Sequence, residues 1–87
     1  MISNKRILVI QLYAYACASD LFACMSNPEY RGSNFKWDKL SSMAIYRTAG
    51  SLFSSGCEIK NKQEESFLKD TVESICKSLI ETSGVKD

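Results

Sequence analysis

Four cysteines are the side chains best suited to chemistry in this chain of 87 residues. They are Cys17, Cys24, Cys57 and Cys76, so the steps between them are 7, 33 and 19 residues. Dithiol redox centres and zinc sites use closely spaced pairs such as Cys-x-x-Cys, and zinc sites often add histidine. The chain has no such pair and no His. The spacing therefore predicts neither a metal site nor redox chemistry, and we expect no cofactor.

A structural disulfide is the use that the spacing favours. In a bundle that runs up, down and up, the first and third helices end at the same pole, which places Cys24 near Cys76. Cys57 lies at the other pole, about 20 Å from Cys76, whereas bridged Cα atoms lie within about 7 Å. A Cys24–Cys76 disulfide would close a 51-residue segment and stabilise the fold by about 4 kcal/mol. The alternative is four reduced cysteines that pack as small apolar side chains.

Two Ser-x-x-Lys strings, at residues 33–36 and 66–69, match the motif of serine acyl-enzymes. That chemistry also needs a deep pocket, an oxyanion hole and further motifs of a much larger fold. The chain has no histidine that could act as a triad base, and no glycine-rich phosphate loop. We therefore expect no enzymatic activity.

Side chains typical of binding hot spots gather in eight residues, at Tyr30, Arg31, Phe35 and Trp37. These four are the candidates for binding a partner protein. In the alternative interpretation, Phe35 and Trp37 fasten the second helix to the core. Their exposure to solvent distinguishes the two.

Residues 1–18 have the pattern of an export signal. Lys5 and Arg6 form a basic start, residues 7–15 form an apolar stretch of secretory length, and Ala-Cys-Ala at residues 16–18 is a small-x-small cleavage site. The stretch is too short for a stable membrane span. We predict cleavage after Ala18, which leaves one domain at residues 19–87 in the periplasm or outside the cell.

Two alternatives remain open for this segment. The apolar run resumes at residues 21–25, and residues 4–25 contain neither Pro nor Gly, so they can form one core helix of a cytoplasmic protein. Residues 7–17 would then be buried against the other helices, whereas a signal segment would be detached or loosely docked. The third interpretation is a small lipoprotein anchored at Cys17.

The rest of the chain predicts an all-α bundle of three, or at most four, helices. The first helix ends near residue 25 or 26, because Pro28 disfavours helical geometry at the residue before it. The second runs from residue 33 or 34 to residue 55, with Gly56 as a left-handed cap. The third begins with Asn61 as N-cap, three residues before Glu64, and ends at residue 82 or 83 before Gly84.

Apolar residues recur at three- and four-residue steps in both later helices, which predicts one buried face on each. They are Trp37, Leu40, Met43, Ala44, Ile45, Ala49, Leu52 and Phe53 in the second helix, and Leu68, Val72, Ile75, Cys76 and Leu79 in the third. Glu65 and Lys69 are spaced to form an ion pair on the third helix. Gly50, inside the second helix, costs about 1 kcal/mol relative to Ala, so we expect a packing reason for it or a local weakness.

The charges argue against nucleic acid as a partner. The net charge is +1, and without residues 1–18 it is −1, from nine basic and ten acidic residues. These charges are dispersed, and no basic stripe could follow a phosphate backbone. The remaining 69 residues form a marginal core for a single domain, which is why a disulfide is expected.

One set of residues carries a resemblance to known proteins: Cys24, residues 54–59, Gln63, Phe67, Val72 and Cys76. In cysteine placement, the Gly-Cys helix end and helix lengths, the chain resembles two kinds of small periplasmic protein. These are the HdeA-like acid chaperones and the immunity proteins that neutralise type VI amidase effectors. The resemblance implies an exported, disulfide-linked helical protein that works by binding another protein. Cys57 and the shortness of the chain depart from both kinds, so no functional residue is carried over.

We therefore expect a non-enzymatic module that binds another protein, as an exported inhibitor, immunity protein or chaperone. The alternative is a cytoplasmic helical inhibitor or antitoxin-like protein in which residues 4–25 are a core helix. The expected partner is another protein, and self-association as a homodimer also fits the pattern.

Overall fold

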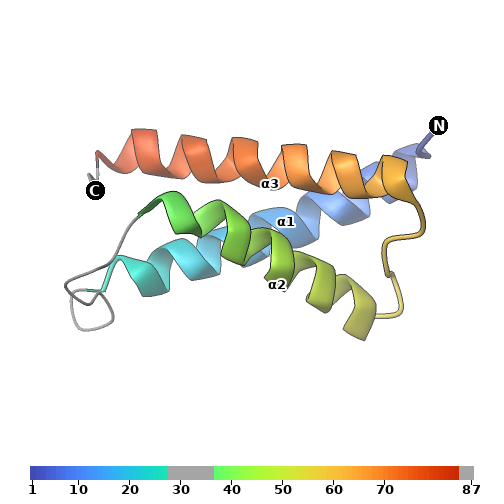
Figure 1. Cartoon of the computed structure of the whole chain (residues 1–87), viewed down its shortest axis with the longest axis horizontal. Helices are drawn as coiled ribbons and strands as arrows, with labels where there is room; N and C mark the ends of the chain where they lie inside the picture. The colour runs from blue at the N-terminus through green and yellow to red at the C-terminus, as the bar shows by residue number, and fades with distance from the viewer. Residues whose placement is uncertain (28–36, 85–87) are drawn as a thin grey trace.

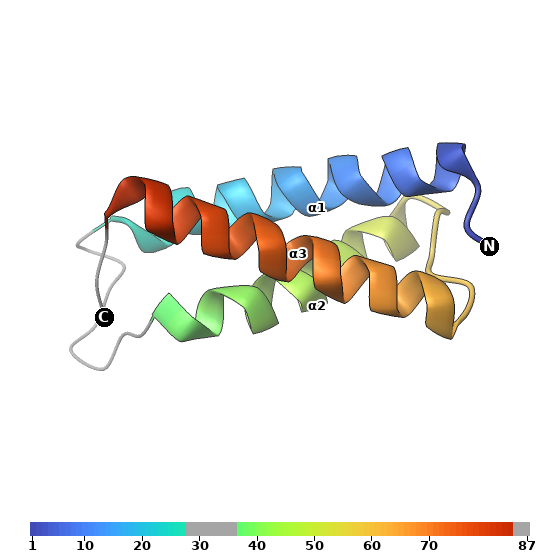
Figure 2. The same cartoon turned by 90° about the horizontal axis from the view of Figure 1, so that it is seen from above.

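The computed structural model describes residues 1–27 and 37–84, and these residues form an all-α fold. The long helices are α1 (Asn4–Met25), α2 (Leu40–Ser54) and α3 (Lys62–Ser83), and a short 3-10 helix, η1 (Trp37–Lys39), precedes α2. The described ranges contain no strand. The helices run up, down and up, so that the end of α1, the start of α2 and the end of α3 lie at one pole (Figure 1, Figure 2). The all-α prediction is confirmed.

Local chemistry sets the helix ends close to where they were predicted. The Asn61 side chain accepts a hydrogen bond from the Glu64 N–H at 2.9 Å, and α3 begins at the next residue. Gly56 (φ +76°) and Gly84 (φ +75°) adopt the left-handed conformation behind α2 and α3, which glycine tolerates because it has no Cβ. α1 ends at Met25, as expected. The predicted start of the second helix, residue 33 or 34, lies outside the described residues.

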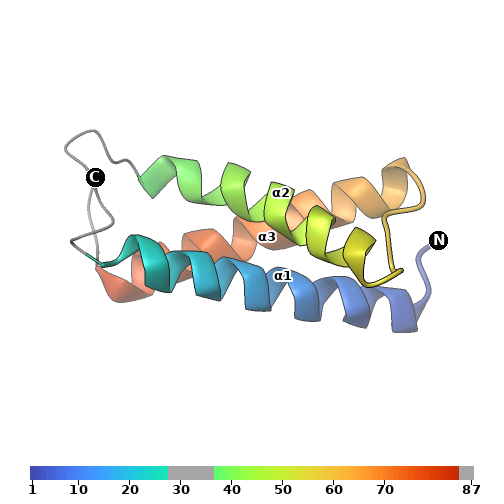
Figure 3. The ribbon, with the colours of Figure 1, turned by 90° about the horizontal axis from the view of Figure 1, so that it is seen from below.

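The core lies between the three helices, and α1 packs against both α2 and α3 (Figure 3). Burying the Ile10 side chain of α1, which is 0% exposed, contributes about 1.5–3 kcal/mol. The other buried residues are Ala14, Ala18, Leu21 and Met25 of α1, Trp37 of η1, Leu40, Ala44, Thr48 and Leu52 of α2, and Glu64, Leu68, Val72 and Cys76 of α3. Of residues 7–17, Ile10 and Ala14 are buried in this core, whereas Leu8, Gln11, Leu12, Tyr15 and Ala16 are exposed.

The buried face of α2 is narrower than the predicted one. Met43 and Phe53 were expected in the core, but they are 37% and 68% exposed. Among the described long helices, α1 and α3 cover one side of α2, so a single row at four-residue steps is buried, and these two side chains are exposed. Thr48 takes a core position instead, since its hydroxyl donates a hydrogen bond to the Ala44 carbonyl at 2.6 Å and leaves its methyl group to pack.

The predicted Cys24–Cys76 disulfide is not present. All four cysteines are free thiols, and no two of them lie at disulfide distance. The side chain of Cys76 is 1% exposed in the core, whereas Cys24 lies on the exposed side of α1. Cys24 is one residue before the end of α1, whereas Cys76 is seven residues before the end of α3, and only Cys76 faces the core. Cys17 is half-buried, with its Sγ 3.6 Å from the Ser51 Oγ.

Candidate functional site

The residues predicted to bind a partner do not form a described surface. Tyr30, Arg31 and Phe35 lie outside the described residues. Trp37 is 2% exposed, and its ring lies against that of Phe22 with the centroids 5.0 Å apart. Trp37 is therefore a core residue rather than an exposed binding residue, as the alternative interpretation held.

Three large apolar side chains are exposed on the side of α1 that faces away from the core. Leu8, Leu12 and Tyr15 are 55%, 60% and 62% exposed, and they follow each other at steps of four and three residues. Gln11 and Ala16 beside them are also exposed, and no charged residue occurs between Arg6 and Asp20. We call Leu8, Gln11, Leu12, Tyr15 and Ala16 the α1 outer face.

This face exists because α1 is apolar on nearly every side but, among the described helices, packs mainly against α2 and α3. A helix that is apolar all round is normally enclosed by protein or by lipid. In the described part of the chain, α1 is the one helix long and apolar enough to cross a membrane by length and composition, with a mean hydropathy of 1.6 over its best 18-residue window. α2 and α3 cover one side, and the α1 outer face is left in solvent.

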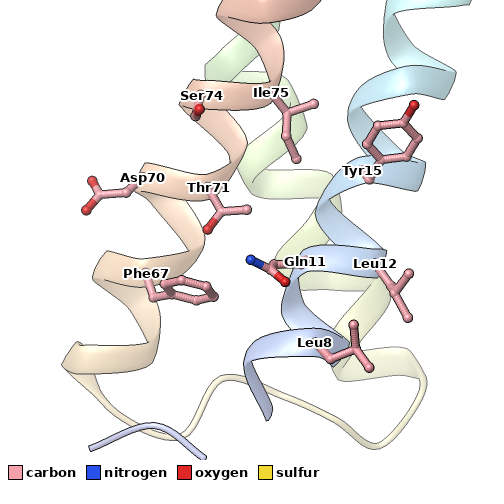
Figure 4. A pocket seen from close by; sticks show the side chains of 9 residues that line it. All are labelled: Leu8, Gln11, Leu12, Tyr15, Phe67, Asp70, Thr71, Ser74 and Ile75. Carbon is pink, nitrogen blue, oxygen red and sulfur yellow. The ribbon is translucent and has the colours of Figure 1, made fainter. Parts of the chain in front are cut away.

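A groove runs beside the α1 outer face, between α1 and α3 (Figure 4). Its volume is about 590 Å³. Phe67, Thr71 and Ile75 line it from α3, Gln11 points into it from α1, and Asp70 is directed away from it at the rim. The groove is therefore mainly apolar, with amide and hydroxyl groups that can orient an occupant.

An ion pair fastens the first turn of α1 to the first turn of α3. The Arg6 Nε donates to the Glu64 Oε2 at 3.0 Å, and the Arg6 Nη2 donates to the Glu64 Oε1 at 3.1 Å. The same Nη2 donates to the Glu58 carbonyl, and the Lys60 N–H donates to the Glu64 Oε1 at 2.8 Å. The Arg6 guanidinium holds the pKa of Glu64 below its usual value, because these hydrogen bonds favour the charged carboxylate over the burial that opposes it. Arg6 is thus a structural residue here.

The outer side of α2 offers a second hollow of about 550 Å³, next to Tyr46, which is 84% exposed. Gly50 forms part of its floor. A Cβ added at Gly50 would meet nothing within 4 Å. Among the described residues, the expected packing reason for this glycine is therefore not found.

Neither the α1 outer face nor the Arg6–Glu64 pair was predicted. Leu8 and Leu12 had been assigned to the apolar stretch of a signal, and Arg6 to its basic start. One signal could have found the face: once the core row of Ile10, Ala14 and Ala18 is assigned, Leu8 and Leu12 form a second row on the same helix.

The described residues contain no group of three or more His, Cys, Asp or Glu side chains that could hold a metal ion. Burial raises the pKa of the Cys76 thiol, a shift that the neighbouring Ser41 hydroxyl partly offsets, so this thiol is poorly suited to act as a nucleophile. No family model matches the chain, and no match was found among the curated proteins or the solved structures.

Proposed function

We propose that the chain is a non-enzymatic protein-binding module and that its docking surface is the α1 outer face together with the adjoining groove. The observation that carries the proposal is the row of Leu8, Leu12 and Tyr15, each more than half exposed. Apolar surface of this kind gains about 25 cal/mol for each Å² removed from water. A contiguous exposed patch beside a groove is the usual sign of a binding surface rather than of scattered apolar residues.

The chemistry of the surface suits an apolar, extended or helical segment of a partner. Leu12 and Tyr15 offer a flat apolar contact and one hydroxyl, the combination that dominates many interfaces. Thr71 and Ser74 of α3 can hydrogen-bond a polar group of the partner, and Asp70 at the rim can pair with a basic side chain. An inhibitor, immunity protein or antitoxin-like protein would act by occupying such a segment.

We further propose that residues 1–18 remain part of the folded domain, as in the cytoplasmic alternative. Ile10, Ala14 and Ala18 are 0% exposed, and cleavage after Ala18 would remove all three from the core. It would also remove Arg6, the partner of Glu64. Lipid attachment at Cys17 needs cleavage just before that residue, and this cleavage would remove Ile10 and Ala14 from the core. The export interpretation would leave the inner faces of α2 and α3 without most of their cover.

Photo-crosslinking in the native host tests the docking surface. A benzophenone amino acid at Leu12 lies on the α1 outer face, and one at Ser66 lies on an exposed position of α3 that does not line the groove. We expect adducts of defined mass from position 12 and none from position 66. Equal adducts from both positions, or none from either, would contradict the proposed surface.

A further inference from the structure

We propose that the partner which fits the α1 outer face is a second copy of this chain, with the two α1 helices paired antiparallel about a two-fold axis at Leu12. This inference rests on the proposed docking surface and assigns its occupant. A helix pair of this kind presents the same patch from both copies, so the patch must be complementary to itself.

The helix geometry supplies the register. At roughly 100° per residue, Lys5, Leu8, Leu12, Ala16 and Ser19 fall in one row, and all but the half-buried Ser19 are exposed. A two-fold axis at Leu12 places residue 12 against itself, residue 8 against residue 16, and residue 5 against residue 19. The large Leu8 side chain of each copy therefore meets the small Ala16 of the other, which is the arrangement that lets two helices interlock.

Charges near the two ends of the row, Lys5 and Asp20, select the antiparallel direction. Lys5 and Asp20 are exposed, and neither has an ion-pair partner within the described part of the chain. Lys5 lies about 10 Å before Leu12 along the helix and Asp20 about 12 Å after it. Antiparallel pairing thus brings Lys5 of each copy beside Asp20 of the other at both ends. Parallel pairing would place like charges together.

The contact is small, so the dimer should be weak. Three large apolar side chains per copy bury much less area than the roughly 800 Å² that a standard interface buries on each partner. A dissociation constant on the order of 100 µM corresponds to such an interface.

Sedimentation equilibrium of the full chain, between about 10 and 500 µM, measures the dimer. Lys5→Glu and Asp20→Lys each place like charges together at both ends, so each should weaken the dimer roughly threefold to tenfold, and the double variant should restore it. Leu12→Glu should abolish the dimer. Lys62→Glu, a charge reversal at an exposed position on α3, is the matched control and should leave it unchanged. Circular dichroism verifies that each variant is folded.

Recovery of the dimer in the charge-swapped double variant is the expected result. A chain that stays monomeric throughout this range, or a dimer that Leu12→Glu leaves intact, would overturn the inference. A monomer that instead floats with phosphatidylcholine–phosphatidylglycerol vesicles would assign the face to lipid and overturn it too. A monomer that still yields position-12 adducts with another protein would overturn the inference and leave the proposed function standing, whereas a monomer without such adducts would remove both.

Discussion

Replacing Arg6 should show how firmly the start of α1 is bound to the rest of the fold. Arg6→Met keeps most of the aliphatic stem but removes both hydrogen bonds to Glu64, whose side chain is 9% exposed, against 17% for that of Arg6. Glu64 would keep the Lys60 N–H at 2.8 Å. Because hydrogen bonds to charged groups contribute about 1.5–3 kcal/mol, we expect the variant to lose about 2 kcal/mol of unfolding free energy.

A double-mutant cycle separates the pair from other effects of the substitution. Glu64→Gln should cost about 1–2 kcal/mol, and the double variant should cost less than the sum by about 1 kcal/mol, because the interaction is lost only once. The assay is urea unfolding followed by far-UV circular dichroism. In a thermal melt, the Arg6→Met loss corresponds to a midpoint about 8–16 °C lower.

The second ion pair of α3 supplies the matched control. The Lys69 Nζ and the Glu65 Oε1 lie 3.2 Å apart, but both side chains are 52% exposed. Lys69→Met should therefore lower the unfolding free energy by less than about 0.5 kcal/mol. If Arg6→Met cost no more than Lys69→Met, and its effect simply added to that of Glu64→Gln, then α1 would not be held by this pair and the reasoning would be refuted.

Three further predictions follow from the same structure. The pKa of Glu64 is lower in the folded chain than its ordinary value of 4.5. The stabilising effect of its charge is therefore complete above pH 4.5 and is lost as the pH falls through the folded pKa. Between these conditions, the unfolding free energy of Glu64→Gln should fall less steeply with decreasing pH than that of the wild type. Gly50→Ala should raise the unfolding free energy by about 0.5–1 kcal/mol, since a Cβ there meets nothing within 4 Å and alanine is the better helix former. A lower midpoint of unfolding in urea would instead show that the fold needs glycine at this position. Iodoacetamide should modify the exposed Cys24 in the native protein and reach Cys76, which is 1% exposed, only after unfolding. Equal rates of modification at the two thiols would contradict the burial of Cys76. An intact mass two hydrogens below that of the fully reduced chain would reveal a disulfide.

The sequence was most informative where structure depends on neighbouring residues. Asn61 and Gly56 act through their own backbone geometry and the next turn, so the ends of α2 and α3 could be predicted from them.

Rotation about a helix axis could not be predicted in the same way. Whether Cys24 faces Cys76, or Phe53 faces the core, depends on which side of each helix its neighbours cover. The same limit applies to α1, where the sequence shows apolar residues on almost every side and cannot tell the buried row of Ile10 from the exposed row of Leu12. To predict a long-range pair such as Arg6 with Glu64, the rotation of α1 and the rotation of α3 about their own axes must both be known.

In the proposed function, α1 is a helix of the core with one face left for a partner. Hydrogen exchange of the full chain, read by mass spectrometry, measures this directly. We expect the amides of residues 10–21 in α1 to be protected as strongly as those of residues 68–76 in α3, since both segments belong to one cooperative core. Rapid exchange throughout α1, with α2 and α3 still protected, would contradict it.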